Sequence, residues 1–217
     1  MNRFLKGAMI LTIAGVIVKI IGAFSKVLVA RILGGEGIGL YMMAYPIYQI
    51  IVSISAAGIP VAISIMIAEK LANRDMRGVQ QVFNVSLRVL TLVGIIFSVG
   101  LYASAEWLIK WNIITDPRAL IPIQLLSPAI IVVTILSCFR GYFQGFQYMV
   151  PTGTSQVFEQ IFRVGSMVGL AYYFIDSGLH LAAGGATFAT FPGVLAGLIV
   201  LVYFYRSQRS LRQQMLS

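Results

Sequence analysis

A pair of opposite charges, Glu159 and Arg163, is the first feature of this sequence that could do chemistry. The two residues lie four positions apart within an apolar stretch, so in a helix they share one face and pair in the favourable order. A charged side chain inside a membrane-spanning helix is unfavourable, and it usually faces a partner or a water-filled cavity. Two interpretations stay open: a structural ion pair within a helix bundle, or part of a cavity that binds a polar cargo.

A stripe of small and polar residues in the first apolar stretch is the second candidate. Its members recur every three or four residues and line one helix face: Ala8, Thr12, Gly15, Lys19, Gly22 and Lys26. Because an ammonium group near mid-span cannot easily reach water, we expect Lys19 to face a cavity and attract a phosphate or carboxylate. Lys26 lies nearer the end of the stretch and can instead extend to the membrane surface.

Three tyrosines and a glutamine in the second apolar stretch form a third candidate. Tyr41, Tyr45 and Tyr48 recur at helical spacing, and Gln49 follows them. An aromatic belt at the membrane interface suits Tyr41, whereas Tyr45, Tyr48 and Gln49 fit either such a belt or a cavity wall that stacks on a sugar. For Arg140, near the end of the fourth apolar stretch, we expect a side chain that extends to the membrane surface.

The composition limits the class of protein. Of 217 residues, 59% are hydrophobic and 11% are charged, and the mean hydropathy is +0.89. This is too little charge for the surface of a soluble domain. Apolar runs of about 20 residues indicate membrane-spanning helices rather than the short alternating strands of a barrel. The net charge of +9 is scattered between these runs, so it favours membrane orientation over nucleic-acid binding.

Motifs for catalysis are absent from the sequence. The single cysteine, Cys138, and the single histidine, His180, cannot form a disulfide within the chain or supply a metal site. No hydrolase or nucleotide-binding pattern occurs, and the glycine-rich residues 34–39 lack the Lys-Ser/Thr ending of a phosphate-binding loop. We therefore expect no enzyme, cofactor or metal, and we expect residues 34–39 to form a tight turn between two spans.

The apolar stretches predict an all-α fold, a six-transmembrane-helix bundle that forms one domain over residues 1–217. The expected spans are approximately 5–33, 38–68, 82–105, 120–143, 152–175 and 181–205, followed by a tail at 206–217. Pro46 and Pro60 are expected to kink the second span. If the chain crosses six times, most basic residues at or beyond the ends of the spans fall on one side, which predicts that both termini are cytoplasmic. These residues are Arg3, Lys6, Lys70, Arg74, Arg77, Arg140, Arg206, Arg209 and Arg212.

Two segments carry a resemblance to a known family. Residues 30–41, A-R-I-L-G-G-E-G-I-G-L-Y, resemble the first-loop signature of polysaccharide and lipid-linked oligosaccharide flippases in the multidrug/oligosaccharidyl-lipid/polysaccharide (MOP, MATE-like) superfamily. Residues 140–145, R-G-Y-F-Q-G, with V-P-T at 150–152 and S-Q-V-F-E-Q-I-F-R-V at 155–164, are similar to the branch containing stage V sporulation protein B. The resemblance covers essentially the whole chain, but only the N-terminal lobe of a family with two six-helix lobes around a cationic cavity.

The resemblance implies a function and a partner. It implies the N-terminal half of a flippase that moves a lipid-linked polysaccharide or peptidoglycan precursor across the bacterial plasma membrane by alternating access, in cell-wall or sporulation pathways. Lys19 and Lys26 would bind the pyrophosphate head group. Lipid II flippases of the same superfamily carry arginines in the first helix. Lys19 keeps that charge here, whereas Ser25 and Lys26 depart from the family's Arg-Asp pair.

Other readings of the function stay open. The alternatives are a cation-coupled multidrug exporter of the same superfamily and a non-transporting scaffold or assembly protein. The exporter would use acidic cavity residues, and Glu159 is the acidic residue within a span. The expected partners are membrane lipids, a lipid-linked glycan with an anionic head group, and a C-terminal lobe or a second copy of the chain, but no nucleic acid.

Overall fold

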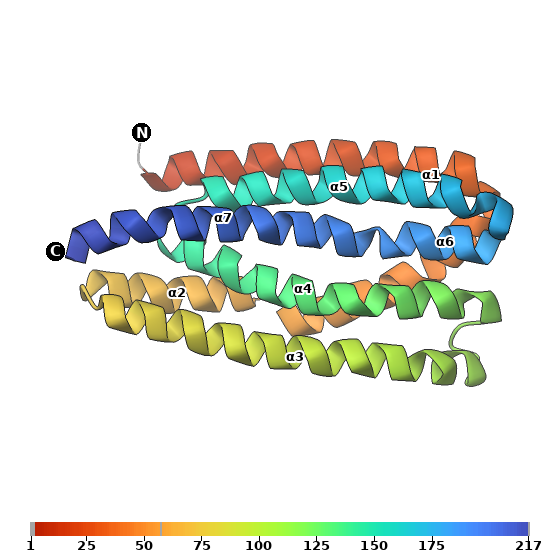
Figure 1. Ribbon diagram of the computed structural model, residues 1–217, viewed down its shortest axis with the longest axis horizontal. Helices are drawn as coiled ribbons and strands as arrows, with labels where there is room; N and C mark the ends of the chain where they lie inside the picture. Colours follow the sequence, from red (N-terminus) through yellow and green to blue (C-terminus); the bar gives the residue numbers. More distant parts are fainter. Residues whose placement is uncertain (1–2, 57, 217) are drawn as a thin grey trace.

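The structure is a bundle of long helices that run along its longest axis (Figure 1). The computed structural model describes residues 3–56 and 58–216, with side chains described for 5–54 and 58–207, and these residues include no strand. The helices are α1 (Arg3–Ala56), α2 (Ile59–Ala72), α3 (Met76–Lys110), α4 (Leu120–Gly145), α5 (Val150–Phe174), α6 (Leu179–Phe188) and α7 (Thr190–Leu216), with short 3₁₀ turns η1 (Pro117–Ala119) and η2 (Ile175–Ser177). The all-α prediction is confirmed.

The break in α1 separates the first two predicted spans. Gly34 has φ 67° and ψ −175°, a conformation that a residue without a Cβ atom adopts readily. The first part of α1 runs beside α5, and after the break the helix returns diagonally toward α2 (Figure 1). The expected turn over residues 34–39 is therefore shorter than predicted, since helix resumes directly after Gly34.

Two further interruptions lie within predicted spans. The helix continues through Pro46, but it is interrupted before α2, where Gly58 has φ 78° and Pro60 lies in the first turn. Proline suits a first turn because its missing N–H has no helical acceptor there. The last predicted span, 181–205, contains a second interruption, since α6 ends at Phe188 and α7 begins at Thr190.

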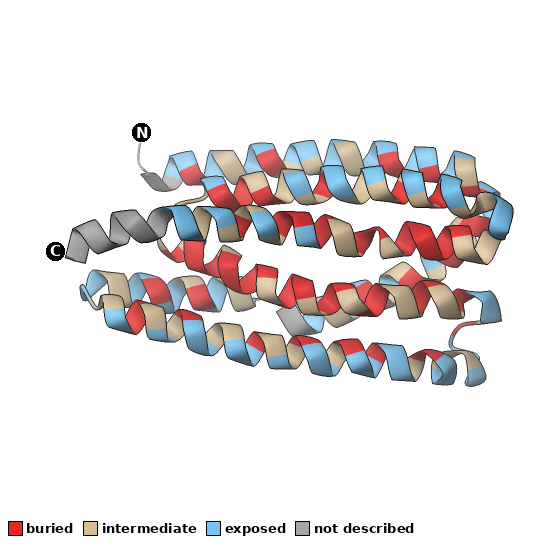
Figure 2. Cartoon of the chain, viewed as in Figure 1, coloured by how far each residue is buried: buried red, intermediate tan, exposed pale blue. Residues whose placement is uncertain are grey.

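The core is centred on α4, which packs against α1, α2, α3, α6 and α7. Figure 2 shows buried residues concentrated along α4 and α6, while the outer faces of α1 and α3 are exposed. Those outer faces are apolar. On α3, for example, the exposed residues Val85, Val89, Leu92, Ile96 and Val99 recur every three or four positions. Such a face suits lipid rather than water.

Four segments among the described residues are long and apolar enough to cross a membrane: Leu5–Ala72, Met76–Lys110, Pro117–Gly145 and Leu179–Ser207. The chain is therefore a helical integral membrane protein. The first segment has 68 residues, more than twice the roughly 20 that one crossing needs. Helix α5 is not among them because glutamine and charged side chains, including Glu159 and Arg163, lower its hydropathy. Six crossings with cytoplasmic termini stay a prediction.

An exposed ion network joins α1 to η1 at the end of the bundle where α4 begins. Arg118 Nη1 lies 2.6 Å from Glu36 Oε1, and Arg118 Nη2 lies 2.8 Å from Asp116 Oδ2. Hydrogen bonds from Arg118 lower the pKa of the Asp116 carboxyl group below its usual value. We call these three residues the rim network. It connects the helix break at Gly34 to the start of α4.

Candidate functional site

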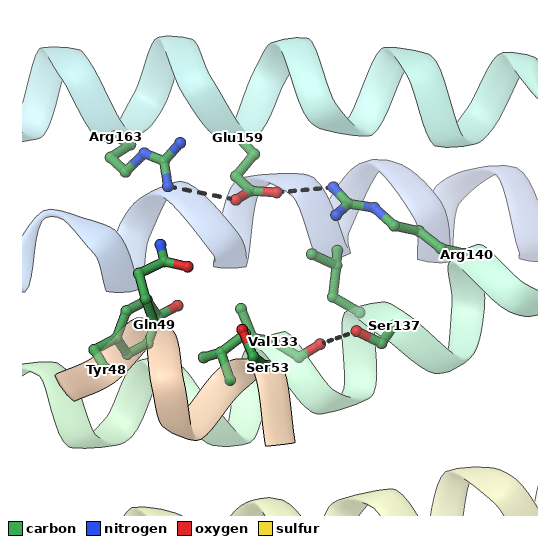
Figure 3. A pocket seen from close by; sticks show the side chains of 10 residues that line it. Tyr48, Gln49, Ser53, Val133, Ser137, Arg140, Glu159 and Arg163 are labelled. Atoms are coloured by element: carbon green, nitrogen blue, oxygen red, sulfur yellow. Dashed lines mark hydrogen bonds and ion pairs between the residues drawn. The ribbon is translucent and has the colours of Figure 1, made fainter. Parts of the chain in front are cut away.

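A second ion network lies between α4 and α5, away from the ends of the bundle. Arg140 Nη2 lies 2.8 Å from Glu159 Oε2, and Arg163 Nη1 lies 3.8 Å from Glu159 Oε1 (Figure 3). The predicted contact between Glu159 and Arg163 is present, but Arg140 makes the shorter one. The expectation that Arg140 extends to the membrane surface was wrong, since its side chain is only 18% exposed. We call Arg140, Glu159 and Arg163 the charged triad.

Two glycines of α7 allow α5 to approach closely at the triad. A Cβ atom at Gly193 would lie 2.6 Å from Arg163 Cβ and 2.9 Å from the Glu159 carbonyl oxygen. A Cβ atom at Gly197 would lie 3.2 Å from Glu159 Cβ. With α7 against the α5 backbone, the Glu159 and Arg163 side chains extend into the space bounded by α4 and the returning part of α1 (Figure 3).

The first of two hollows, which we call the α4 hollow, has a volume of about 310 Å³. Its lining residues come from the returning part of α1, from α4 and from α5: Tyr48, Gln49, Val52, Ser53, Val133, Leu136, Ser137, Arg140, Glu159 and Arg163. The structure thus brings together four predicted site residues, Tyr48, Gln49, Glu159 and Arg163. Sequence reasoning missed Ser53 and Ser137, whose hydroxyl groups add hydrogen-bonding capacity.

The second hollow, which we call the α1 hollow, has a volume of about 370 Å³. It is bounded by the first part of α1, by the returning part of α1 and by α5. It is lined by Lys19, Gly22, Ala23, Ser25, Lys26, Tyr41, Tyr45, Gln160, Arg163 and Met167. The remaining predicted site residues, Lys19, Lys26 and Tyr45, therefore meet here. Arg163 lines both hollows and connects them.

The two lysines of the α1 hollow are exposed, and among the described residues neither takes part in an ion pair. Arg163 in the same hollow donates a hydrogen bond to the side-chain oxygen of Gln160, which is 4% exposed. Together the two hollows are lined by four cationic side chains and one carboxylate. This excess of positive charge, framed by apolar helices, favours an anionic ligand.

The tyrosines form a continuous aromatic wall along the returning part of α1. The Tyr41 and Tyr45 rings stack with centroids 5.3 Å apart, and the Tyr45 and Tyr48 centroids are 5.9 Å apart. The interface-belt reading is wrong for Tyr41, which is 9% exposed and packs in the core. Tyr45 is half-buried, and Gln49 is exposed. Tyr45 lines the α1 hollow and Gln49 lines the α4 hollow, and a cavity-wall role stays a prediction for both.

The sequence matches a known family over almost its whole length. Residues 4–217 match the family described as polysaccharide biosynthesis protein. Stage V sporulation protein B of Bacillus subtilis (strain 168) is 34% identical over 211 residues, which cover 97% of this chain and 40% of that protein. The lipid II flippase MurJ of the same organism is 30% identical over 218 residues, which cover 96% and 40% of the two chains.

The fold also matches solved structures. A crystal structure of MATE in complex with MaD3S superposes with a TM-score of 0.78 over 95% of this chain and 46% of that one. The sequence identity is 16%, so this likeness concerns the fold alone. The chain spans about two fifths of the length of the two curated relatives and just under half of that solved chain.

Proposed function

The chain belongs to the polysaccharide biosynthesis protein family, and from this membership and its basic hollows we propose that it is the N-terminal lobe of a flippase. Its cargo is a lipid-linked polysaccharide or peptidoglycan precursor, and it works in the bacterial plasma membrane. The lobe crosses the membrane six times, with both termini in the cytoplasm. It acts by alternating access together with a C-terminal lobe or a second copy of the chain.

The observation that carries this proposal is the charge of the α1 hollow. Lys19 and Lys26 share this hollow with Arg163, and among the described residues no carboxylate lines it. Cationic side chains in such a place attract phosphate, and an arginine can bind two phosphate oxygens at once. Lipid-linked sugars carry phosphate or pyrophosphate between the lipid and the glycan. The aromatic wall beside the cations suits the sugar, because aromatic rings pack against apolar ring faces.

The multidrug-exporter alternative is less well supported. A cation-binding exporter needs an available carboxylate in its cavity. Glu159 lines the α4 hollow, where two arginines engage its carboxylate. The net charge around it is positive, which repels a cationic drug. The scaffold alternative predicts that replacing hollow residues alters stability alone, so activity measurements distinguish it from transport.

A chimera tests the proposal. This chain replaces the matching N-terminal part of the Bacillus subtilis lipid II flippase, and the chimera is expressed in cells depleted of their own flippases. We expect growth to be restored by the chimera, lost with Lys19→Ala, and partly kept with Lys19→Arg, at equal membrane abundance. Lys110→Ala, at an exposed lysine that lines neither hollow, is the matched control. Equal growth with Lys19→Ala and the unchanged chimera contradicts the proposed role of Lys19.

A further inference from the structure

The two contacts of Glu159 are unequal. The 2.8 Å contact with Arg140 is a charge-assisted hydrogen bond, whereas the 3.8 Å separation from Arg163 is beyond hydrogen-bonding distance. Arg140 is held further by Ser155, whose Oγ lies 3.4 Å from both Nε and Nη2. Glu159 is thus fixed to Arg140 and only loosely attached to Arg163.

Arg163 is oriented by a different residue. It donates a hydrogen bond to Gln160, which lines the α1 hollow with Lys19 and Lys26. Gln160 itself is confined by the first part of α1, since a Cβ atom at Gly22 would lie 3.1 Å from Gln160 Nε2. Gln160 is therefore a positioning residue that holds the Arg163 guanidinium beside the lysines.

We propose that the charged triad is an anion-exchange site, in which a phosphate group of the cargo displaces Glu159 from Arg163 while Arg140 retains Glu159. The ligand is a phosphate or pyrophosphate ester that enters the α1 hollow. The inference rests on the proposed function and deepens it. It gives Arg163 the role of a third phosphate ligand beside Lys19 and Lys26, and it gives Arg140 the role of storing the displaced carboxylate.

Breaking a buried ion pair is unfavourable mainly because it leaves one charge without an opposite partner. The exchange avoids this loss. When Arg163 turns to the phosphate, Glu159 keeps its shorter contact with Arg140, so each charge retains an opposite partner. In the empty site, Glu159 partly neutralises Arg163, which limits repulsion among the cations of the α1 hollow. Without cargo, the Glu159 carboxylate therefore supplies the negative charge that faces Arg163, and with cargo bound a phosphate supplies it instead.

The exchange predicts effects of opposite sign for neighbouring residues. Without Glu159, Arg163 is always available, so an anion binds more tightly. Without Arg140, Glu159 has Arg163 as its remaining partner within the triad, and an anion binds more weakly. Removing both leaves Arg163 free at the same net charge as the wild-type triad, so the double variant also binds more tightly than wild type. A purely structural network predicts that every one of these variants weakens binding.

The test measures binding of farnesyl pyrophosphate to the purified chain in lipid nanodiscs. We expect Arg163→Gln to weaken binding about 10-fold to 100-fold, the effect of a charge-assisted hydrogen bond. Glu159→Gln should tighten it about threefold to fivefold, and Arg140→Gln should weaken it by a similar factor. Arg140→Gln/Glu159→Gln should bind more tightly than wild type. Lys110→Gln, outside both hollows, is the control and should match wild type.

Inorganic pyrophosphate and farnesol are the comparison probes. Tighter binding of farnesyl pyrophosphate than of the inorganic ion assigns the site to a lipid head group, and the reverse assigns it to a free phosphate. The exchange holds in both cases. Binding of farnesol as tight as that of farnesyl pyrophosphate overturns it, because the phosphate then contributes nothing.

Two results with the triad variants overturn the exchange and leave the proposed function standing. One is a double variant that binds no more tightly than wild type, since only net charge then matters. The other is weaker binding by a folded Glu159→Gln variant. Thermal unfolding of each sample monitors folding, and if Glu159→Gln does not fold, the double variant is used to test the exchange.

If Lys19→Gln leaves probe binding unchanged while the triad variants behave as expected, the lysine part of the proposed function fails and the exchange stands. Absence of probe binding to wild type overturns the exchange, and the chimera decides the proposed function separately.

Discussion

The charged triad and the rim network use the same chemical groups in opposite proportions. The triad has two arginines and one carboxylate, and its side chains are 14% to 21% exposed. The rim network has one arginine and two carboxylates, and the side chains of Arg118 and Glu36 are 46% and 64% exposed, whereas that of Asp116 is 22% exposed. Water and salt screen the rim charges, so this network contributes little to stability. The triad is sheltered between helices, where each charge depends on its partners.

The difference in proportion also separates the two networks by function. The rim network has a surplus of negative charge in a position that water reaches. The triad has a surplus of positive charge that two hollows share, and further cations lie beside it. Exposure alone distinguishes a stabilising contact from a weak one. Exposure and net charge together distinguish a position that can accept an anion from one that cannot.

The largest expected effect on stability comes from Glu159→Gln. This variant leaves two arginines of the triad without a carboxylate. Breaking a fully buried ion pair costs about 3–5 kcal/mol, and with partial exposure we expect a loss of about 2–3 kcal/mol. Thermal and denaturant unfolding in detergent measure it. The matched control is Glu36→Gln in the rim network, which should change stability much less. Similar losses for the two variants would remove the distinction between the networks.

Part of the fold that holds these two networks could be predicted from the sequence, and part could not. Apolar runs predicted the helical membrane fold, and the helices α4 (Leu120–Gly145) and α5 (Val150–Phe174) lie where helices were expected at 120–143 and 152–175, although whether α5 spans the membrane stays a prediction. The family resemblance is confirmed by the match over residues 4–217. The interruption at Gly58 lies beside Pro60, where a kink was expected, whereas the interruption at Ala189 was not predicted, because it depends on packing between helices rather than on local periodicity.

The composition of the candidate site was only partly predictable. Glu159 and Arg163 are four residues apart, so helical periodicity reveals their contact. Arg140 contacts Glu159 from another helix across 19 positions, and periodicity within one helix contains no information about such a contact. The lysine stripe was predicted on one face of α1, but its meeting with Arg163 depends on how α1 packs against α5. Tertiary contacts, rather than local pattern, determine which charges share a hollow.

The next largest effect tests the packing that positions the triad. Gly193→Ala places a methyl group 2.6 Å from Arg163 Cβ and 2.9 Å from a backbone oxygen, so α5 must move away from α7. We expect a loss of about 1–3 kcal/mol, the usual effect of overpacking. Gly165→Ala on α5 is the control, because nothing lies within 4 Å of its added methyl group. Unfolding experiments in the same detergent compare the two. A neutral Gly193→Ala variant would show that close packing against α7 does not position the triad.

A smaller effect separates the two arginines of the triad. Double-mutant cycles pair Glu159→Gln with Arg140→Gln and with Arg163→Gln. We expect a coupling of about 1–2 kcal/mol for Arg140 and less than about 1 kcal/mol for Arg163, because only Arg140 makes a charge-assisted hydrogen bond to Glu159. Equal couplings would contradict the unequal attachment on which the anion exchange depends.

The smallest effect concerns the rim network and its dependence on pH. Hydrogen bonds from Arg118 lower the pKa of Asp116 in the folded chain. A carboxyl group whose folded pKa is depressed contributes stability above its unfolded pKa of about 3.9, and this contribution is lost as the pH falls through the folded pKa. The contribution of the rim network to folding stability should therefore be constant between about pH 5 and 8 and decrease only in more acidic solution.

Thermal unfolding of wild type and Asp116→Asn from neutral to acidic pH measures this contribution. The difference between the two should be constant near neutrality and shrink in acid. A difference that grows as the pH falls would show that Arg118 does not stabilise the ionised form of Asp116, and the rim network would then have no role as an ion pair.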